Sequence, residues 1–328
     1  MHIFCVSNPI SNVICHTVRL EKGLSSDECL FIRTRMIRGT EGFRYIDIPP
    51  QTEWAGEVVL AFYNFLTNIA NKNISDGLHV YVPHLYHDGH SILAFHERTV
   101  SISYVEEGGV AHGLNNNVET QLMPLDFKLL SSLTKKHGKG VLIKSNPDNS
   151  QYEALINSQK CKGYPFFLSC SRHKFSFFVC RAAFREHEKR YRVEPLNYIK
   201  PQHKHIAASL SIFYMPSLKF SQKLRFSGID WMHGLQDAME VENILEDNLV
   251  VKLHGDTPLD IRNEFAKKFP RSLKYEKLQL DMGSSFYVDE ASVLSWKNAI
   301  FAYRTSAIRY TKAFSPTTRI LFSNSIVE

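Results

Sequence analysis

The sequence predicts an α/β protein in which parallel β-strands alternate with helices. Short apolar runs typical of buried strands recur along the chain, and they are separated by longer segments whose apolar residues have helical spacing. The expected strands in the first half are residues 2–6, 28–33, 79–82, 101–105, 140–143 and 166–169. A strand-then-helix order is typical of parallel sheets covered by helices, and it disfavours a sandwich or a helical bundle.

Between these strands, residues 52–71 carry apolar side chains at helical spacing, and Thr52 can cap the segment, so we expect a helix of core residues there. The first residues, 2–6, are expected to form a buried strand. Ser7, Asn8 and Pro9 follow this strand and interrupt its apolar run, so we expect a turn at this point.

At 328 residues the chain is longer than most single cores, so two domains are expected. Residues 192–205 interrupt the periodicity with Pro195 and Pro201, which places the boundary between residues 1–195 and 196–328. Beyond this boundary the rhythm restarts, and the expected elements are a strand at 209–215, a helix at 231–246 and a strand at 248–252. The last helix of the chain can return to the N-terminal domain.

The composition is that of an ordinary globular protein, with 44% hydrophobic and 22% charged residues and a formal net charge of +6. Basic residues are spread along the chain, and the one dense segment, 181–205, is interpreted as a helix end plus linker, so no nucleic-acid partner is expected. The sequence has neither a long apolar run nor a secretory leader, which predicts a cytoplasmic protein that can associate peripherally with the anionic inner membrane.

No metal site is expected from the cysteines and histidines. The six cysteines have no ligand spacing and are interpreted as reduced core thiols; they are Cys5, Cys15, Cys29, Cys161, Cys170 and Cys180. His84, His87 and His90 are spaced three apart, but Pro83 and Gly89 favour a loop around them. Their expected role is loop packing or acceptor contact.

Three short polar motifs follow expected strands, and the first is acidic. Glu106 and Glu107 come after the strand at 101–105 and before Gly108. Adjacent side chains on an extended backbone point in opposite directions, so one of the two carboxylates would face a cleft and could act as a general base. A solvated acidic turn is the competing interpretation.

The second motif, Lys252 to Gly255, places His254 after the strand at 248–252, where the imidazole can donate a proton to a departing phosphate. The third places Thr305 and Ser306 at the start of a helix, whose free amides suit a phosphate or carboxylate. Ser284 and Ser285 can play the same part, and Glu276 can hold ribose hydroxyls. A histidine satisfying a turn, a plain helix cap and an exposed charge are the competing interpretations.

The three motifs resemble, in their order, the acidic, histidine–proline and serine/threonine motifs of bacterial sialyltransferases and polysialyltransferases. Gly255 stands where that family has a proline, and a proline follows only at Pro258. The resemblance implies the GT-B type, with two Rossmann-like domains facing a central cleft. It also implies inverting, metal-independent transfer of sialic acid from CMP-sialic acid, without a cofactor, to a hydroxyl of lipooligosaccharide or capsule.

In that reading residues 1–195 carry the acceptor side and 196–328 the donor side. Glu106 or Glu107, with Glu107 preferred, would be the base, and His254 would protonate the departing phosphate. Lys252, Gly255 and Glu276 would serve the donor, as would the hydroxyl groups of Thr305, Ser306, Ser284 and Ser285. Two alternatives stay open: transfer of another CMP-linked keto sugar (Kdo, pseudaminic or legionaminic acid), and a catalytically silent glycan-binding protein of the same fold.

Overall fold

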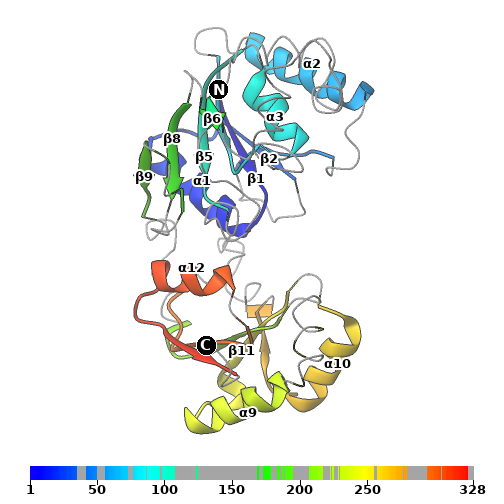
Figure 1. Cartoon of the computed structure of the whole chain (residues 1–328), viewed down its shortest axis with the longest axis vertical. Coiled ribbons are helices and arrows are strands. Elements are labelled where there is room, and N and C mark those ends of the chain that lie inside the picture. Colours follow the sequence, from blue (N-terminus) through cyan, green and yellow to red (C-terminus); the bar gives the residue numbers. More distant parts are fainter. Residues whose placement is uncertain are drawn as a thin grey trace. The chain divides into compact units, whose positions relative to one another are not determined.

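The computed structural model contains two compact units, Met1–Glu194 and Pro195–Glu328 (Figure 1). The structure describes residues 1–34, 42–49, 56–72, 77–85, 87–96, 98–107, 123–124, 168–169, 173–178, 183–184, 187, 189–194, 207–216, 222, 224, 228, 230–254, 257–275, 277–278, 294–303 and 305–323. That the last helix returns to the N-terminal domain stays a prediction.

The first unit is built on a seven-stranded sheet with the order β3-β2-β1-β4-β5-β8-β9, in which all pairs are parallel. Its strands are β1 (His2–Val6), β2 (Cys29–Arg33), β3 (Tyr45–Asp47), β4 (Leu78–Val82), β5 (Thr99–Val105), β8 (His173–Phe178) and β9 (Arg190–Arg192). The strand order reverses between β1 and β4, as in Rossmann-type sheets, whose ligands bind beyond the carboxyl ends of the strands near such a reversal.

The helices of this unit are α1 (Pro9–Glu21), α2 (Gly56–Lys72) and α3 (Asp88–Phe95). Alternate side chains of β1 point to opposite faces of the sheet. Ile3 and Cys5 pack in one core cluster with residues of α2 and α3. Phe4, on the other face, stacks on Phe31, which in turn stacks on His16 of α1. The sheet is therefore covered on both faces, and Figure 1 shows α2 and α3 together on one side of it.

The turn expected after the first strand is a helix of 13 residues, α1. Asn8 begins it as an N-cap: its Oδ1 accepts from the backbone N–H of Ser11 at 2.8 Å, and the Ser11 hydroxyl accepts from the backbone N–H of Asn8 at 3.1 Å. Pro9 then occupies the first helical position, which favours a helix. Residues 10–18 of α1 are all buried, so polar side chains such as Ser11 and Asn12 lie inside together with the apolar ones.

Two further segments differ from the expectation. The loop expected around His87 and His90 is helical from Asp88 onward, because His87 Nδ1 accepts from the backbone N–H of Gly89 at 3.1 Å and caps α3. Within 181–205, expected as a helix end plus linker, Arg190–Arg192 instead form β9, which pairs with β8 at the edge of the sheet. The pairing partner, not the local composition, decides this structure.

The second unit is built on a five-stranded parallel sheet with the order β12-β11-β10-β13-β14. Its strands are β10 (Ser211–Tyr214), β11 (Leu249–Lys252), β12 (Leu273–Lys274), β13 (Asn298–Phe301) and β14 (Arg319–Phe322). The strand order again reverses once, between β10 and β13. The predicted α/β class with two Rossmann-like domains, the components of the GT-B type, is confirmed; that they face a central cleft stays a prediction.

The helices of the second unit are α9 (Trp231–Val241), α10 (Leu259–Lys268) and α12 (Ser306–Phe314), with a 3₁₀ turn, η3, at Glu246–Asn248. α9 and α10 share one apolar core cluster, in which Trp231 and Phe265 pack against Phe213 of β10. α9 is shorter than the expected 231–246 because Asn243 has a positive φ of 51° and Ile244 donates back to the Met239 carbonyl at 2.8 Å.

Most of the strands expected from the sequence are confirmed where the structure describes them, as β1, β2, β4, β5, β10 and β11. The expected strand at 166–169 is described only at Leu168–Ser169, where β7 pairs with β6 (Met123–Pro124), and residues 140–143 lie outside the described residues. The helix expected at 52–71 is α2, described from Gly56.

Three of the six cysteines are described, Cys5, Cys15 and Cys29, and all three are buried free thiols. Burial raises the pKa of the Cys29 thiol to about 11. Cys161, Cys170 and Cys180 lie outside the described residues. In the part of the chain that the structure describes, every helix is too short or too polar to cross a membrane.

Candidate functional site

The carboxyl edge of the first sheet brings together three polar side chains from different strands. Ser7 follows β1, His84 lies just beyond β4, and Glu107 lies just beyond β5. His84 Nε2 lies 3.0 Å from Glu107 Oε1, and the Ser7 hydroxyl donates to Glu107 Oε2. Since β1 and β4 flank the reversal of strand order, this cluster lies where Rossmann-type sheets bind ligands.

The start of α1 also holds the backbone of Glu107. The Asn8 side-chain amide donates to the carbonyl oxygen of Glu107, while the same Asn8 caps α1 through its carbonyl oxygen. Ser7 is fixed in turn, because its backbone N–H donates to the Ser11 hydroxyl at 3.0 Å. The capping turn of α1 therefore positions the acidic motif across a sequence separation of about a hundred residues.

The two glutamates of this motif differ in exposure. Glu106 is 0% exposed, and its backbone N–H donates to the Phe177 carbonyl at 3.1 Å, so this residue belongs to the sheet interior. The side chains of Glu107 and His84 are each 12% exposed. Adjacent residues on an extended backbone point in opposite directions, which explains the difference. Of the pair, only the Glu107 side chain can be reached from solvent.

His84 is held by the beginning of α3. His90, fully buried, donates from Nδ1 to the carbonyl oxygen of His84 at 3.1 Å. The His90 ring lies 4.9 Å from that of His87, centroid to centroid. Among the described residues, no group of three or more His, Cys, Asp and Glu side chains is placed to hold a metal ion. The three histidines thus support one another through packing and backbone contacts.

In the second unit, His254 is an exposed residue that lies just beyond β11. Its carbonyl oxygen accepts from the backbone N–H of Thr257 at 3.0 Å and from Arg262 Nη2 at 3.4 Å. Arg262 Nε also donates to the Thr257 carbonyl at 2.8 Å, and the Thr257 hydroxyl donates to the Pro216 carbonyl at 3.3 Å. The backbone at His254 and Thr257 is therefore tied both to α10 and to the end of β10, while the side chain of His254 stays in solvent.

Lys252, the cation predicted to serve the donor, is engaged within its own unit. Its ammonium lies 5.4 Å from the centroid of the Tyr275 ring, and Tyr275 is 1% exposed. This is the geometry of a cation–π contact. To bind a phosphate, the ammonium would have to move away from this ring or contact the ring and the phosphate at the same time.

α12 begins at Ser306, four residues after Ala302 and close to the carboxyl end of β13. Thr305 is its N-cap, and the Thr305 hydroxyl oxygen is buried without a hydrogen-bond partner among the described residues. The first amides of a helix also lack partners within the helix. An oxyanion of a phosphate or a carboxylate would satisfy the hydroxyl and these amides together.

Several predicted donor residues lie outside the described residues, and their roles stay predictions: Gly255, Glu276, Ser284 and Ser285. The roles assigned to Glu106, Glu107, Lys252, His254, Thr305 and Ser306 stay predictions as well.

Four residues of the site were not assigned to it from the sequence: Ser7, Asn8, His84 and Arg262. For Asn8 a signal exists, because an asparagine before a proline is a helix N-cap followed by the preferred first residue. His84 was grouped with two other histidines and interpreted as a loop residue. Its pairing with Glu107 depends on the sheet order, in which β4 and β5 are neighbours.

No protein-family model matches this chain. No curated protein matches it. Among solved structures, it is similar to a candidate UDP-N-acetylglucosamine 2-epimerase from Listeria monocytogenes, with 9% identity, a TM-score of 0.48 and coverage of 99% of this chain and 79% of that one. It is also similar to S. aureus MnaA solved with UDP, with 10% identity, a TM-score of 0.46 and coverage of 99% and 79%.

A third similar structure is a 2,6-sialyltransferase from Photobacterium sp. JT-ISH-224 in a ternary complex with CMP and lactose. It is 11% identical, has a TM-score of 0.46, and the match covers 98% of this chain and 78% of that one. At these identities and TM-scores, the likenesses settle neither the reaction nor the substrate.

Proposed function

We propose that this chain is an inverting, metal-independent glycosyltransferase that moves sialic acid from CMP-sialic acid to a hydroxyl of a cell-surface glycan. The observation that carries the proposal is the Glu107 carboxylate, which Ser7 and His84 hold at the carboxyl edge of the first sheet while it stays partly open to solvent. A carboxylate in this position can take the proton of an acceptor hydroxyl within hydrogen-bond reach.

In this proposal Glu107 is the base, and Ser7 and His84 are positioning residues that contact its two oxygens separately. An ionised carboxylate has about four lone-pair sites, so these two contacts leave room for the acceptor hydroxyl. Because both oxygens are held, the carboxylate has few orientations to lose when the acceptor binds, which favours reaction. Glu106, fully buried, supports the strand end instead.

The donor side of the proposal rests on the second unit. The acceptor oxygen would attack the anomeric carbon while the bond from that carbon to the CMP phosphate oxygen breaks. The acceptor proton goes to Glu107, and His254 gives a proton to the departing phosphate. The exposure of His254 and its tethered backbone support this role, and the N-terminus of α12 with Thr305 offers donors for an anionic group.

The test is the release of CMP from a panel of CMP-activated keto sugars in the presence of galactose-ended and sialylated acceptors. We expect Glu107→Gln to lower kcat by about a hundredfold to ten-thousandfold, the usual contribution of a general base. Glu106→Gln is the matched control, since it makes the same chemical change at the adjacent, inaccessible carboxylate. His254→Ala should lower the rate with every acceptor.

Hydrogen exchange of each variant shows whether it is folded. A folded Glu107→Gln protein that transfers at the wild-type rate would refute the role of Glu107. A folded wild-type protein that releases CMP from none of the donors would refute the reaction. Release from a single donor other than CMP-sialic acid would keep the reaction and replace the sugar.

A further inference from the structure

A pocket of about 320 Å³ opens at the amino edge of the first sheet, between α2 and the beginnings of β1, β2 and β3. Its walls are formed by Met1, Leu30 and Arg44 on the sheet side and by Phe65, Ile69 and Lys72 on α2. The strands are parallel, so this edge is opposite the one that carries Ser7, His84 and Glu107. The proposed transfer reaction does not use it.

The floor of this amino-edge pocket is apolar. Leu30 and Ile69 are 1% and 9% exposed and belong to the core cluster shared with α2 and α3. Met1 and Phe65 are only partly buried and pack against the same cluster. Met1 is held at the head of β1, because its carbonyl accepts from the backbone N–H of His79 at 2.9 Å. The pocket therefore exposes apolar surface that continues the core.

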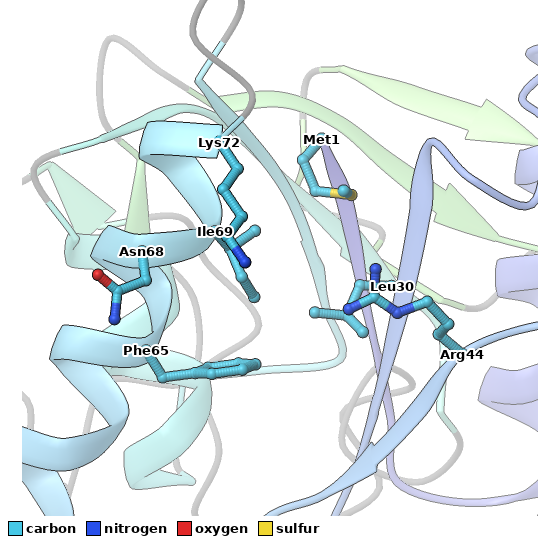
Figure 2. Close-up of a pocket in the computed structure, with 7 residues that line it drawn as sticks. All are labelled: Met1, Leu30, Arg44, Phe65, Asn68, Ile69 and Lys72. Atoms are coloured by element: carbon cyan, nitrogen blue, oxygen red, sulfur yellow. The ribbon is translucent and has the colours of Figure 1, made fainter.

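The rim is cationic. Arg44 and Lys72 are both exposed, and neither forms an ion pair with a residue in the described part of the chain. Figure 2 shows their side chains extending from opposite walls, Lys72 from α2 and Arg44 from the strand side, with Phe65 on α2 below Lys72 and Leu30 beside the end of Arg44. Two cations on either side of an apolar floor complement a ligand with an anionic head and an apolar body.

We propose that this pocket binds a small amphipathic carboxylate with an apolar body of about seven carbons. At about 30 Å³ per heavy atom, its volume holds roughly ten heavy atoms, the size of octanoate. The carboxylate lies between Arg44 and Lys72, and the chain covers Phe65, Ile69 and Leu30. A compact inorganic anion would leave this apolar floor in water, and a neutral molecule would leave the two cations without a counter-charge.

The test is a calorimetric titration of the full-length chain with octanoate, together with ¹³C-methyl NMR of Ile69, assigned through Ile69→Val. We expect saturable binding of one octanoate that shifts the Ile69 methyl signal. Octanol keeps the apolar body and lacks the charge, and butyrate keeps the charge and lacks the body. The affinity for each should be at least about tenfold lower than for octanoate, because each lacks one of the two sources of affinity.

Lys72→Met and Arg44→Gln remove one cation each and should each weaken octanoate binding about fivefold to tenfold. The matched control is Lys174→Met, which removes an exposed lysine of β8 and should leave octanoate binding unchanged. The variants change exposed residues, so folding is preserved and is checked by the methyl spectrum. The proposal is overturned by equal affinity for octanoate and octanol, by an unshifted Ile69 signal, or by wild-type affinity in both cation variants.

Discussion

His16 makes the stability of the first unit dependent on pH, and its environment sets the size of the effect. The residue is 0% exposed on α1, its ring stacks on Phe31 at 4.3 Å, and its Nε2 lies 2.7 Å from the hydroxyl of Tyr45. Burial, with a smaller contribution from the charge of Arg19, lowers the pKa of His16 from about 6.5 to about 3. The folded protein therefore holds this imidazole neutral at pH values where the unfolded chain protonates it.

The sign follows from linkage. Because the folded pKa lies below the unfolded one, the stabilisation is complete above about pH 6.5 and is lost as the pH falls from there toward 3. At pH 4.5, about two pH units below its ordinary pKa, the imidazole is protonated in the unfolded chain but stays neutral in the folded one, which costs the folded state about 3 kcal/mol of stability. His16→Phe keeps the stacked ring and removes the titration, and it loses the hydrogen bond to Tyr45, worth about 1 kcal/mol.

We therefore expect His16→Phe to be less stable than the wild type by about 1 kcal/mol at pH 7.5 and more stable by roughly 2 kcal/mol at pH 4.5. The two stability curves should cross near about pH 6. Hydrogen exchange measured by mass spectrometry on peptides from α1 gives the free energy of opening in the full-length chain. Peptides from β10 and β11 are the internal control.

A difference between wild type and His16→Phe that stays constant from pH 7.5 to 4.5 would refute the reasoning, because it would mean that burial does not hold His16 neutral. His2 does not disturb this comparison. Its pKa is also lowered, to about 4, mainly by burial and next by the neighbouring His79, but its titration is common to both proteins and cancels in the difference.

Three further perturbations test the packing of the first unit by urea unfolding. Gly77→Ala should destabilise the unit by about 2 kcal/mol or more, because φ is +67° and an added Cβ would lie 2.7 Å from a Val100 methyl. Gly23→Ala has a similar φ of +65° but nothing near the added Cβ, so it should cost only about 1 kcal/mol. Equal losses in the two variants would contradict the steric argument. Asn8→Ala removes both the cap and the bond to the Glu107 carbonyl and should lower the free energy of unfolding by about 2 kcal/mol, whereas Asn8→Ser keeps a cap and should lower it by about 1 kcal/mol; similar losses for both would show that the cap does not contribute. Leu66→Ala, at a fully buried core position, should cost about 3 kcal/mol, and a loss below about 1 kcal/mol would contradict its burial.

The sequence predicted the fold class because buried parallel strands leave short apolar runs, as in residues 2–6 and 101–105. It did not predict α1. Ile10, Val13, Ile14 and Val18 have helical spacing, but Ser7, Asn8 and Pro9 were interpreted as a turn, although Asn8 and Pro9 are the N-cap and the first residue of a helix. β9 was missed for another reason, since its residues are exposed and basic and form a strand only because β8 lies beside them.

For the candidate site, the sequence placed Glu107 and His254 just beyond the ends of strands, and the structure has both there. The sequence could not predict that Ser7 and His84 converge on Glu107, because strand order determines which ends are neighbours, and local patterns do not encode that order. The sequence preference for Glu107 over Glu106 had no strong ground, and in the proposal that preference rests on the exposure of each side chain.

The outermost strands of both sheets are short: β3 and β9 have three residues each, β12 has two and β14 has four. Each of these strands contains at least one charged residue: Asp47 in β3, Arg190 and Arg192 in β9, Lys274 in β12 and Arg319 in β14. An unpaired strand edge can recruit the edge of another molecule, and short, charged edges suppress that pairing. The chain should therefore have little tendency to associate through its sheet edges when it is concentrated for titrations and spectroscopy. Lengthening an edge strand or neutralising its charged residues should increase that association.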